Sequence, residues 1–142
     1  MHDEYSLGAA WTAGNIVSTA ADMSAWVHAL FCEDGRVVSA ASLAQMTEMR
    51  VDPESGFVYG LGLRDVPKQI PTAAALDAIG HDGGIAGFSS TIMYIPAWRL
   101  CLAASVNDAY PSAGKESLKS DLTEAVLAGL KASAEAAPAS AL

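Results

Sequence analysis

The segment Gly80-His81-Asp82-Gly83-Gly84 combines the residue types best suited to chemistry in this chain. A histidine gains or loses a proton near neutral pH and can orient a substrate by hydrogen bonding. Neighbouring glycines leave backbone N–H groups unobstructed, so that a substrate carbonyl could lie against the chain. The combination is typical of the wall of a catalytic cleft, although a histidine with a glycine two residues later is a weak motif by itself.

A literal Ser-x-x-Lys motif, Ser112 to Lys115, has the spacing in which a lysine one helical turn later activates a serine nucleophile. The chain holds fourteen serines and four lysines, so one such pair arises easily by chance. Ser112 precedes a predicted helix, where serine is a common N-cap, and Gly114 is a poor residue for holding the lysine in register. We therefore interpret Ser112 as a helix cap.

No metal or cofactor site is expected. The histidines His2, His28 and His81 are widely separated and match no spacing of metal ligands. The two cysteines, Cys32 and Cys101, lie 69 positions apart and form no disulfide framework. We interpret them as buried free thiols, with a disulfide between them as the alternative.

Composition indicates one globular domain, because 51% of the 142 residues are hydrophobic and 17% are charged. The formal net charge of −8 argues against a nucleic-acid surface, which needs clustered lysine and arginine. No run is long and apolar enough to span a membrane, and the first residues lack the order of a signal peptide. As written, the chain is expected to be cytoplasmic or a piece of a longer protein. Residues 1–135 are expected to form the domain and residues 136–142 a frayed tail.

Three helices are predicted from capping residues and apolar spacing. The first begins after Thr19, with Asp22 three positions later, and ends before Asp34-Gly35. The second follows Ser39 and spans about Ala40–Met49. The third spans about Lys115–Ala134 and carries apolar residues at four-residue steps, the spacing of a core-facing stripe. This row consists of Leu118, Leu122, Val126 and Leu130.

The middle of the chain changes to strand patterns. In Val58–Leu63 large side chains alternate with glycine, so one face of the expected strand is bare backbone that another group must approach closely. Arg64–Leu76 is expected to be a loop, and a short strand is expected near Ala78–Asp82. Two apolar strands follow, Phe88–Ile95 and Leu100–Val106, joined as a hairpin. The expected fold class is therefore α+β, with a small antiparallel sheet of about three strands packed against helices.

The histidine segment extends to a longer pattern, Gly80-His81-x-Gly83-Gly84-x-x-Gly87-Phe88-Ser89-Ser90. This pattern resembles the third active-site motif of the serine β-lactamase and penicillin-binding-protein family. It is most similar to the branch containing class C β-lactamases, D-alanyl-D-alanine carboxypeptidases and esterases. Ala13–Met23 and Tyr59–Leu63 are also similar to family segments, in the same order. The likeness runs from about Gly8 to Leu130 and implies the C-terminal part of the β-lactamase/transpeptidase-like fold.

The resemblance assigns roles to the residues of this motif. His81 takes the place of the family's lysine or histidine, which steers the substrate and assists proton transfer. Gly83 would let the substrate approach the strand, and the N–H of Gly84 would be one of two oxyanion-hole donors. Asp82 would face away. The alternative for His81 is a structural strand histidine without a chemical role.

Two motifs of the family are missing ahead of His81: Ser-x-x-Lys, which holds the nucleophile, and Tyr-x-Asn or Ser-x-Asn. Ser105-Val106-Asn107 fits the latter by letters but follows the histidine motif, which is the wrong order. The resemblance therefore implies part of a serine hydrolase, acting by acyl transfer on a β-lactam, a D-Ala-D-Ala peptide or an ester once an upstream segment completes it. Alone, the chain is expected to be inactive. The alternative is a non-catalytic binding or assembly module on the same scaffold.

The expected partners follow from the missing motifs. A small-molecule or peptide acyl substrate would bind only to the completed site. Without further strands, Leu100–Val106 would keep an unpaired edge, which favours a homo-oligomer or association with the missing N-terminal part. No nucleic-acid or membrane partner is expected. Members of the family are often periplasmic or secreted.

Overall fold

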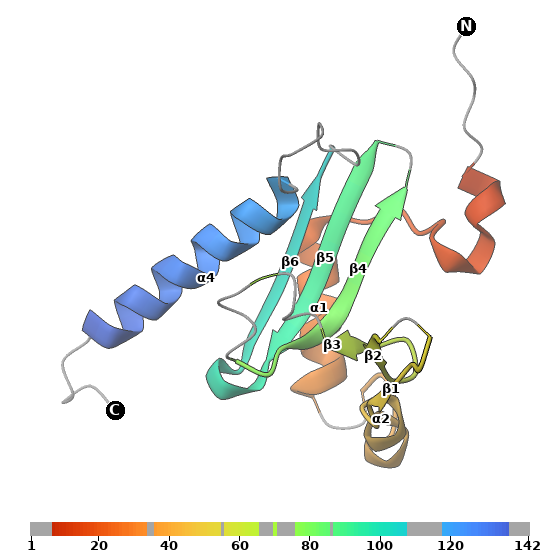
Figure 1. Ribbon diagram of the computed structural model, residues 1–142, viewed down its shortest axis with the longest axis horizontal. Coiled ribbons are helices and arrows are strands. Elements are labelled where there is room, and N and C mark those ends of the chain that lie inside the picture. Colours follow the sequence, from red (N-terminus) through yellow and green to blue (C-terminus); the bar gives the residue numbers. More distant parts are fainter. Residues whose placement is uncertain are drawn as a thin grey trace, which may run out of the picture.

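The computed structural model describes residues 7–33, 36–54, 56–65, 70, 76–85, 87–107 and 118–136. An antiparallel sheet lies at its centre, with α1 behind the sheet and α4 along its other side (Figure 1). The elements in chain order are η1 (Leu7–Ala13), α1 (Ala20–Phe31), α2 (Ala40–Met46), β1 (Arg50–Val51), β2 (Val58–Tyr59), β3 (Arg64–Asp65), β4 (Ile79–Ile85), β5 (Phe88–Ile95), η3 (Pro96–Trp98), β6 (Leu100–Val106) and α4 (Leu118–Ala136).

The sheet confirms the α+β class and the antiparallel pairing, but the prediction of about three strands is wrong. Six strands are described, in the order β1-β2-β3-β4-β5-β6. The long strands β4, β5 and β6 have seven, eight and seven residues, whereas β1, β2 and β3 have two each. Two residues are too few to show a period in the sequence. β4 also continues through Gly83 and Gly84, three residues beyond the predicted end at Asp82.

The segment predicted as a strand over Val58–Leu63 is a tight hairpin. Only Val58–Tyr59 is strand, and the chain reverses so that the N–H of Gly60 donates to the Leu63 carbonyl at 2.7 Å. Gly62 lies at φ +71°, the left-handed region that favours glycine. Arg64–Asp65, predicted as loop, forms the returning strand.

The close approach expected at this glycine pattern occurs at Gly60. The N–H of Leu61 donates to the Met46 carbonyl at 3.1 Å, beside the end of α2. A Cβ atom on Gly60 would lie 2.1 Å from the same oxygen, which no real side chain tolerates. The absence of a side chain at Gly60 therefore lets the backbone of the hairpin pack against the C-terminal end of α2.

The two faces of the sheet bury different partners, because successive strand residues point to opposite sides. Met93 and Ile95 of β5 form a core with Leu127 of α4, and all three are fully buried. Tyr94, between them, lies on the other face and stacks on Phe31 of α1 at 4.8 Å between ring centroids. Helices α4 and α1 therefore cover opposite faces of β5.

The predicted helix starts are confirmed by their caps. The Thr19 side chain accepts from the N–H of Asp22 at 3.1 Å, and the Ser39 side chain accepts from the N–H of Ser42 at 3.1 Å. α2 ends at Met46, three residues before the predicted end. No helix of the described residues is long and apolar enough to cross a membrane.

The apolar row of α4 does not face the core. Leu122, Val126 and Leu130 are 46%, 42% and 41% exposed, whereas Lys119, Thr123 and Leu127 are buried. The buried row lies one residue further along each turn, and so about 100° around the helix. Lys119 sets this rotation because it pairs with a carboxylate on β4. The predicted first residues of this helix, the Ser112–Lys115 motif and the frayed tail after 136 lie outside the described residues.

One stabilising substitution follows from α4. Gly129 lies inside the helix, is exposed, and an added Cβ would meet no atom within 4 Å. Gly129→Ala is therefore expected to raise the free energy of unfolding by about 0.5–1 kcal/mol, because alanine loses less backbone entropy in a helix. Urea unfolding of both proteins measures the difference. Gly60→Ala is the opposing control, since its Cβ would meet the Met46 carbonyl; an unchanged or lower midpoint for Gly129→Ala would contradict the expectation.

Candidate functional site

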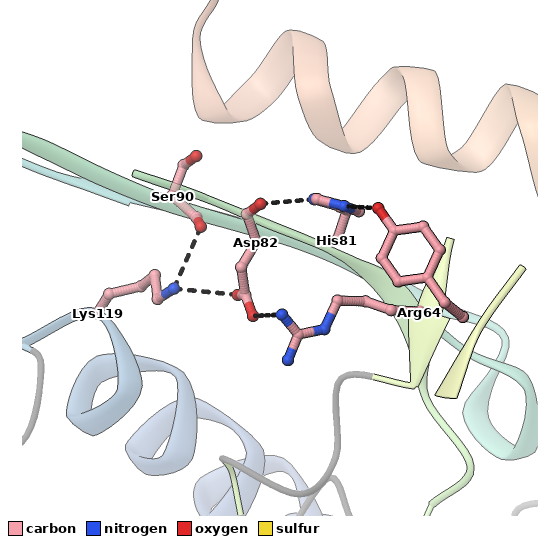
Figure 2. Close-up of polar contacts among 6 residues, drawn as sticks. Arg64, His81, Asp82, Ser90 and Lys119 are labelled. Carbon is pink, nitrogen blue, oxygen red and sulfur yellow. Dashed lines mark hydrogen bonds and ion pairs between the residues drawn. The ribbon is translucent and has the colours of Figure 1, made fainter. Parts of the chain in front are cut away.

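His81 lies on β4 between two oxygen partners (Figure 2). Its Nδ1 contacts the backbone carbonyl of Asp82, and its Nε2 contacts the hydroxyl of Tyr59, from β2. A carbonyl only accepts, so Nδ1 carries the proton. In the neutral ring Nε2 is then the acceptor, and the Tyr59 hydroxyl donates to it. The two rings meet edge to face, with centroids 5.6 Å apart.

The outer edge of β4 is open beside His81. β5 pairs with β4 from Ile79 to Ile85, but β3 pairs only with Ile79 and Gly80. From His81 to Ile85, no other strand of the described part of the chain pairs with this edge. Gly83 and Gly84 lie on this stretch, and both are exposed. The backbone here is accessible to an extended ligand, which could add as a further strand.

The two glycines differ in the space beside them. Gly83 shares the face of His81, and a Cβ atom there would lie 2.6 Å from the Ser90 hydroxyl oxygen. A Cβ atom on Gly84, which faces the other side, would meet nothing within 4 Å. Space at Gly83 is therefore limited on the histidine face.

A cluster of opposite charges lies behind His81, on the other face of β4 (Figure 2). The Asp82 carboxylate pairs with the Lys119 ammonium at 3.0 Å and with the Arg64 guanidinium at 3.7 Å. Lys119 also donates to the Ser90 carbonyl at 3.3 Å. The three charged side chains are only 10–16% exposed. Asp82 thus faces away from His81, as predicted, while its carbonyl holds the imidazole.

The cluster connects three elements around the site. Arg64 comes from β3, Asp82 from β4 and Lys119 from α4. The Arg64 guanidinium also lies 5.1 Å from the centre of the Phe57 ring, a cation–π arrangement. Anchoring Asp82 on one face fixes the backbone that presents its carbonyl to His81 on the other.

The structure brings His81, Gly83 and Gly84 together on one strand and keeps the other candidates apart. His28 lies on α1 and contacts Glu33 at 3.2 Å. Ser105 pairs with Ser90, so β5 separates it from β4. His2, Ser112 and Lys115 lie outside the described residues.

Three residues at the site had no predicted role: Tyr59, Arg64 and Lys119. Tyr59 belongs to a segment similar to the family, but its contact with His81 depends on the hairpin. Arg64 was assigned to a loop. For Lys119 one signal was available: it precedes a polar Thr123 and an apolar Leu127 at four-residue steps, a second row beside the apolar one.

The fold and the open histidine strand define the sheet portion of a serine hydrolase-like fold. A family model described as Beta-lactamase matches residues 2–126, and the chain therefore belongs to the beta-lactamase family. Among solved structures it is similar to a D-stereospecific amidohydrolase from Streptomyces sp., with 27% sequence identity and a TM-score of 0.55. This likeness covers 75% of the chain but only 29% of the amidohydrolase. No curated protein matches.

Proposed function

We propose that this chain supplies the histidine strand of a serine hydrolase active site that a further segment, carrying Ser-x-x-Lys and Tyr-x-Asn, completes. The observation that carries the proposal is the open edge of β4, where a hydrogen-bonded His81 stands beside two exposed glycines. Membership of the beta-lactamase family and the likeness to an amidohydrolase support acyl transfer as the reaction class.

In the proposed reaction, the serine of the completing segment attacks the substrate's acyl carbon, and the serine proton passes to a neighbouring base. The negative charge that develops on the acyl oxygen is stabilised by backbone donors, one of them the N–H of Gly84. The bond to the leaving nitrogen or oxygen then breaks, and that atom takes a proton. His81 assists through Tyr59: the hydroxyl that donates to Nε2 can pass its proton to that nitrogen as it takes one from the reacting group, and the reverse transfer returns it.

The proposed substrates are acyl compounds that can lie along β4: a β-lactam, a D-Ala-D-Ala peptide or a simple ester. Because the similar solved structure is a D-stereospecific amidohydrolase, amides of D-configured acids are also proposed as substrates to test. Gly83 and Gly84 are exposed and carry no side chain that would hold an acyl group away from the strand backbone.

The test compares the chain alone with a form extended by a segment from its own reading frame that carries the two missing motifs. A chromogenic cephalosporin, a p-nitrophenyl ester and a D-amino-acid p-nitroanilide report the reaction. The chain alone is expected to show only background hydrolysis, and the completed form to turn over at least one substrate. If the completed form folds and hydrolyses none of them, the chain is better explained as a binding or assembly module.

A related prediction concerns Ser112. A fluorophosphonate probe, which reacts with activated serines, is expected to leave the isolated chain unlabelled, because Ser112 is interpreted as a helix cap. Gel fluorescence and peptide mapping measure the labelling. Labelling of Ser112 that disappears in Lys115→Ala would contradict this expectation and identify a nucleophile within the chain.

The proposed partner is the completing segment or, in its absence, a second copy of the chain. β6 is the last strand of the described sheet, and its outer edge has no strand partner there. Several large apolar side chains are also exposed, among them Trp11, Ile16 and Val17 at 73–84%. Such surfaces favour association. Sedimentation equilibrium at micromolar concentration is expected to show a dimer or larger oligomer of the isolated chain, and a cooperative, well-folded monomer would contradict this.

A further inference from the structure

The two cysteines, distant in sequence, meet where α1 ends against β6. Cys32 directly follows α1, and its N–H donates to the His28 carbonyl at 2.8 Å. Burial and the neighbouring Cys32 raise the pKa of the Cys101 thiol, which indicates that the two thiols lie near each other. Both cysteines are free and neither is fully buried.

The surrounding contacts hold the two backbones together independently of the thiols. Cys101 pairs with Tyr94 in the sheet, and the Tyr94 ring stacks on Phe31, the residue before Cys32. Further up α1, the Ser24 hydroxyl donates to the Cys101 carbonyl at 3.4 Å. The helix α1 therefore packs against the strands that carry Cys101 and Tyr94, with Cys32 at its end near them.

We propose that Cys32 and Cys101 are a modification site, which a small-molecule disulfide such as oxidised glutathione converts to an intramolecular disulfide. A disulfide needs Cβ atoms about 3.5–4.5 Å apart and backbones that are already close. The strand pairing of Cys101 with Tyr94 and the stacking of Tyr94 on Phe31, the residue before Cys32, bring the two backbones close together in this way. The proposal does not depend on the hydrolase function.

The reaction proceeds by thiol–disulfide exchange. The Cys32 thiolate attacks one sulfur of the small disulfide, which forms a mixed disulfide and releases one small thiolate. The Cys101 thiolate then attacks the Cys32 sulfur, which forms the Cys32–Cys101 bond and releases the second small thiolate. Two protein thiols are oxidised, one small disulfide is reduced to two thiols, and the two protons pass to those thiols.

The order of attack follows from the environment of Cys101. Burial, with the neighbouring Cys32, raises the pKa of the Cys101 thiol to about 11. Cys101 is therefore assigned to the closing step. The closing rate is expected to rise with pH, because only the thiolate attacks.

The test treats the reduced chain with oxidised glutathione at pH 9 and digests it without reductant. Mass spectrometry is expected to find one peptide pair joining Cys32 to Cys101, about 2 Da lighter than the two free peptides. The link closes a long loop, so the Tm of the chain, measured at one fixed concentration, is expected to rise by about 5–15 °C and to return after reduction.

Cys32→Ser and Cys101→Ser are the matched variants, and neither is expected to show the Tm rise with oxidant. If a serine variant fails to fold, the Tm of the oxidised wild-type chain is compared before and after reduction, which also isolates the effect of the disulfide. The proposal is overturned if both wild-type cysteines still take up an alkylating agent after oxidation at pH 9. It is equally overturned if they retain glutathione at that pH, or if the disulfide joins two chains.

Discussion

His81→Ala in the completed enzyme is expected to lower kcat by roughly ten- to a thousandfold, the usual range for an assisting acid–base group. The imidazole stands at the open edge of β4, where the proposed substrate lies, and its Nε2 faces the Tyr59 hydroxyl. Alanine removes the proton carrier but leaves the strand backbone and its N–H donors in place. The remaining activity is therefore expected to exceed that of the chain without a nucleophile.

Two companion variants separate a chemical role from a structural one. Tyr59→Phe keeps the ring but removes the hydroxyl, so a smaller loss of kcat is expected. Nitrogen NMR is expected to show His81 as the Nδ1-protonated tautomer in the wild-type chain and in Tyr59→Phe alike, because the Asp82 carbonyl accepts from Nδ1 in both. His28→Ala is the control, because His28 is an exposed histidine on α1 whose side chain contacts Glu33 and not His81. Unchanged turnover in His81→Ala would make His81 a structural residue.

The sequence predicted a strand at His81 because its information is local, although the strand continues three residues beyond the predicted end at Asp82. The orientation of Asp82 away from His81 was implied by the family resemblance, and it agrees with the alternation of side chains along a strand. Capping at Thr19 and Ser39 was predictable for the same reason, since each cap bonds within its own first turn. Such features do not depend on distant parts of the chain.

Contacts between distant segments were not predictable in this way. The Tyr59–His81 contact depends on the hairpin at Gly60–Leu63, and the glycines there indicated close approach without identifying the Met46 carbonyl. In α4, periodicity predicted that the row Leu118, Leu122, Val126 and Leu130 faces the core. The structure instead buries the neighbouring row of Lys119, Thr123 and Leu127. Lys119 pairs with the buried Asp82 carboxylate, and leaving that charge without a cation would cost more free energy than exposing part of Leu122.

Asp82→Ala is expected to destabilise the chain by about 3–5 kcal/mol, because it leaves the buried Lys119 ammonium without its carboxylate and removes the partner of Arg64. The same loss frees the β4 backbone whose carbonyl orients His81. Urea unfolding followed by circular dichroism measures the stability. The double variant Asp82→Leu/Lys119→Met, which removes both charges, is expected to lose less than the two single variants together.

Arg50→Met is the matched control for this cluster. Arg50 pairs with Glu48 at 2.8 Å, close to the Asp82–Lys119 distance, but both side chains are exposed, at 77% and 62%. An exposed pair contributes about 0–1 kcal/mol, since water screens the charges. A similarly small loss of stability in Asp82→Ala would mean that the charged side chains behind His81 are solvated and do not anchor the β4 backbone. A large loss with Asp82→Ala and a small one with Arg50→Met would show that burial makes this cluster the anchor of β4.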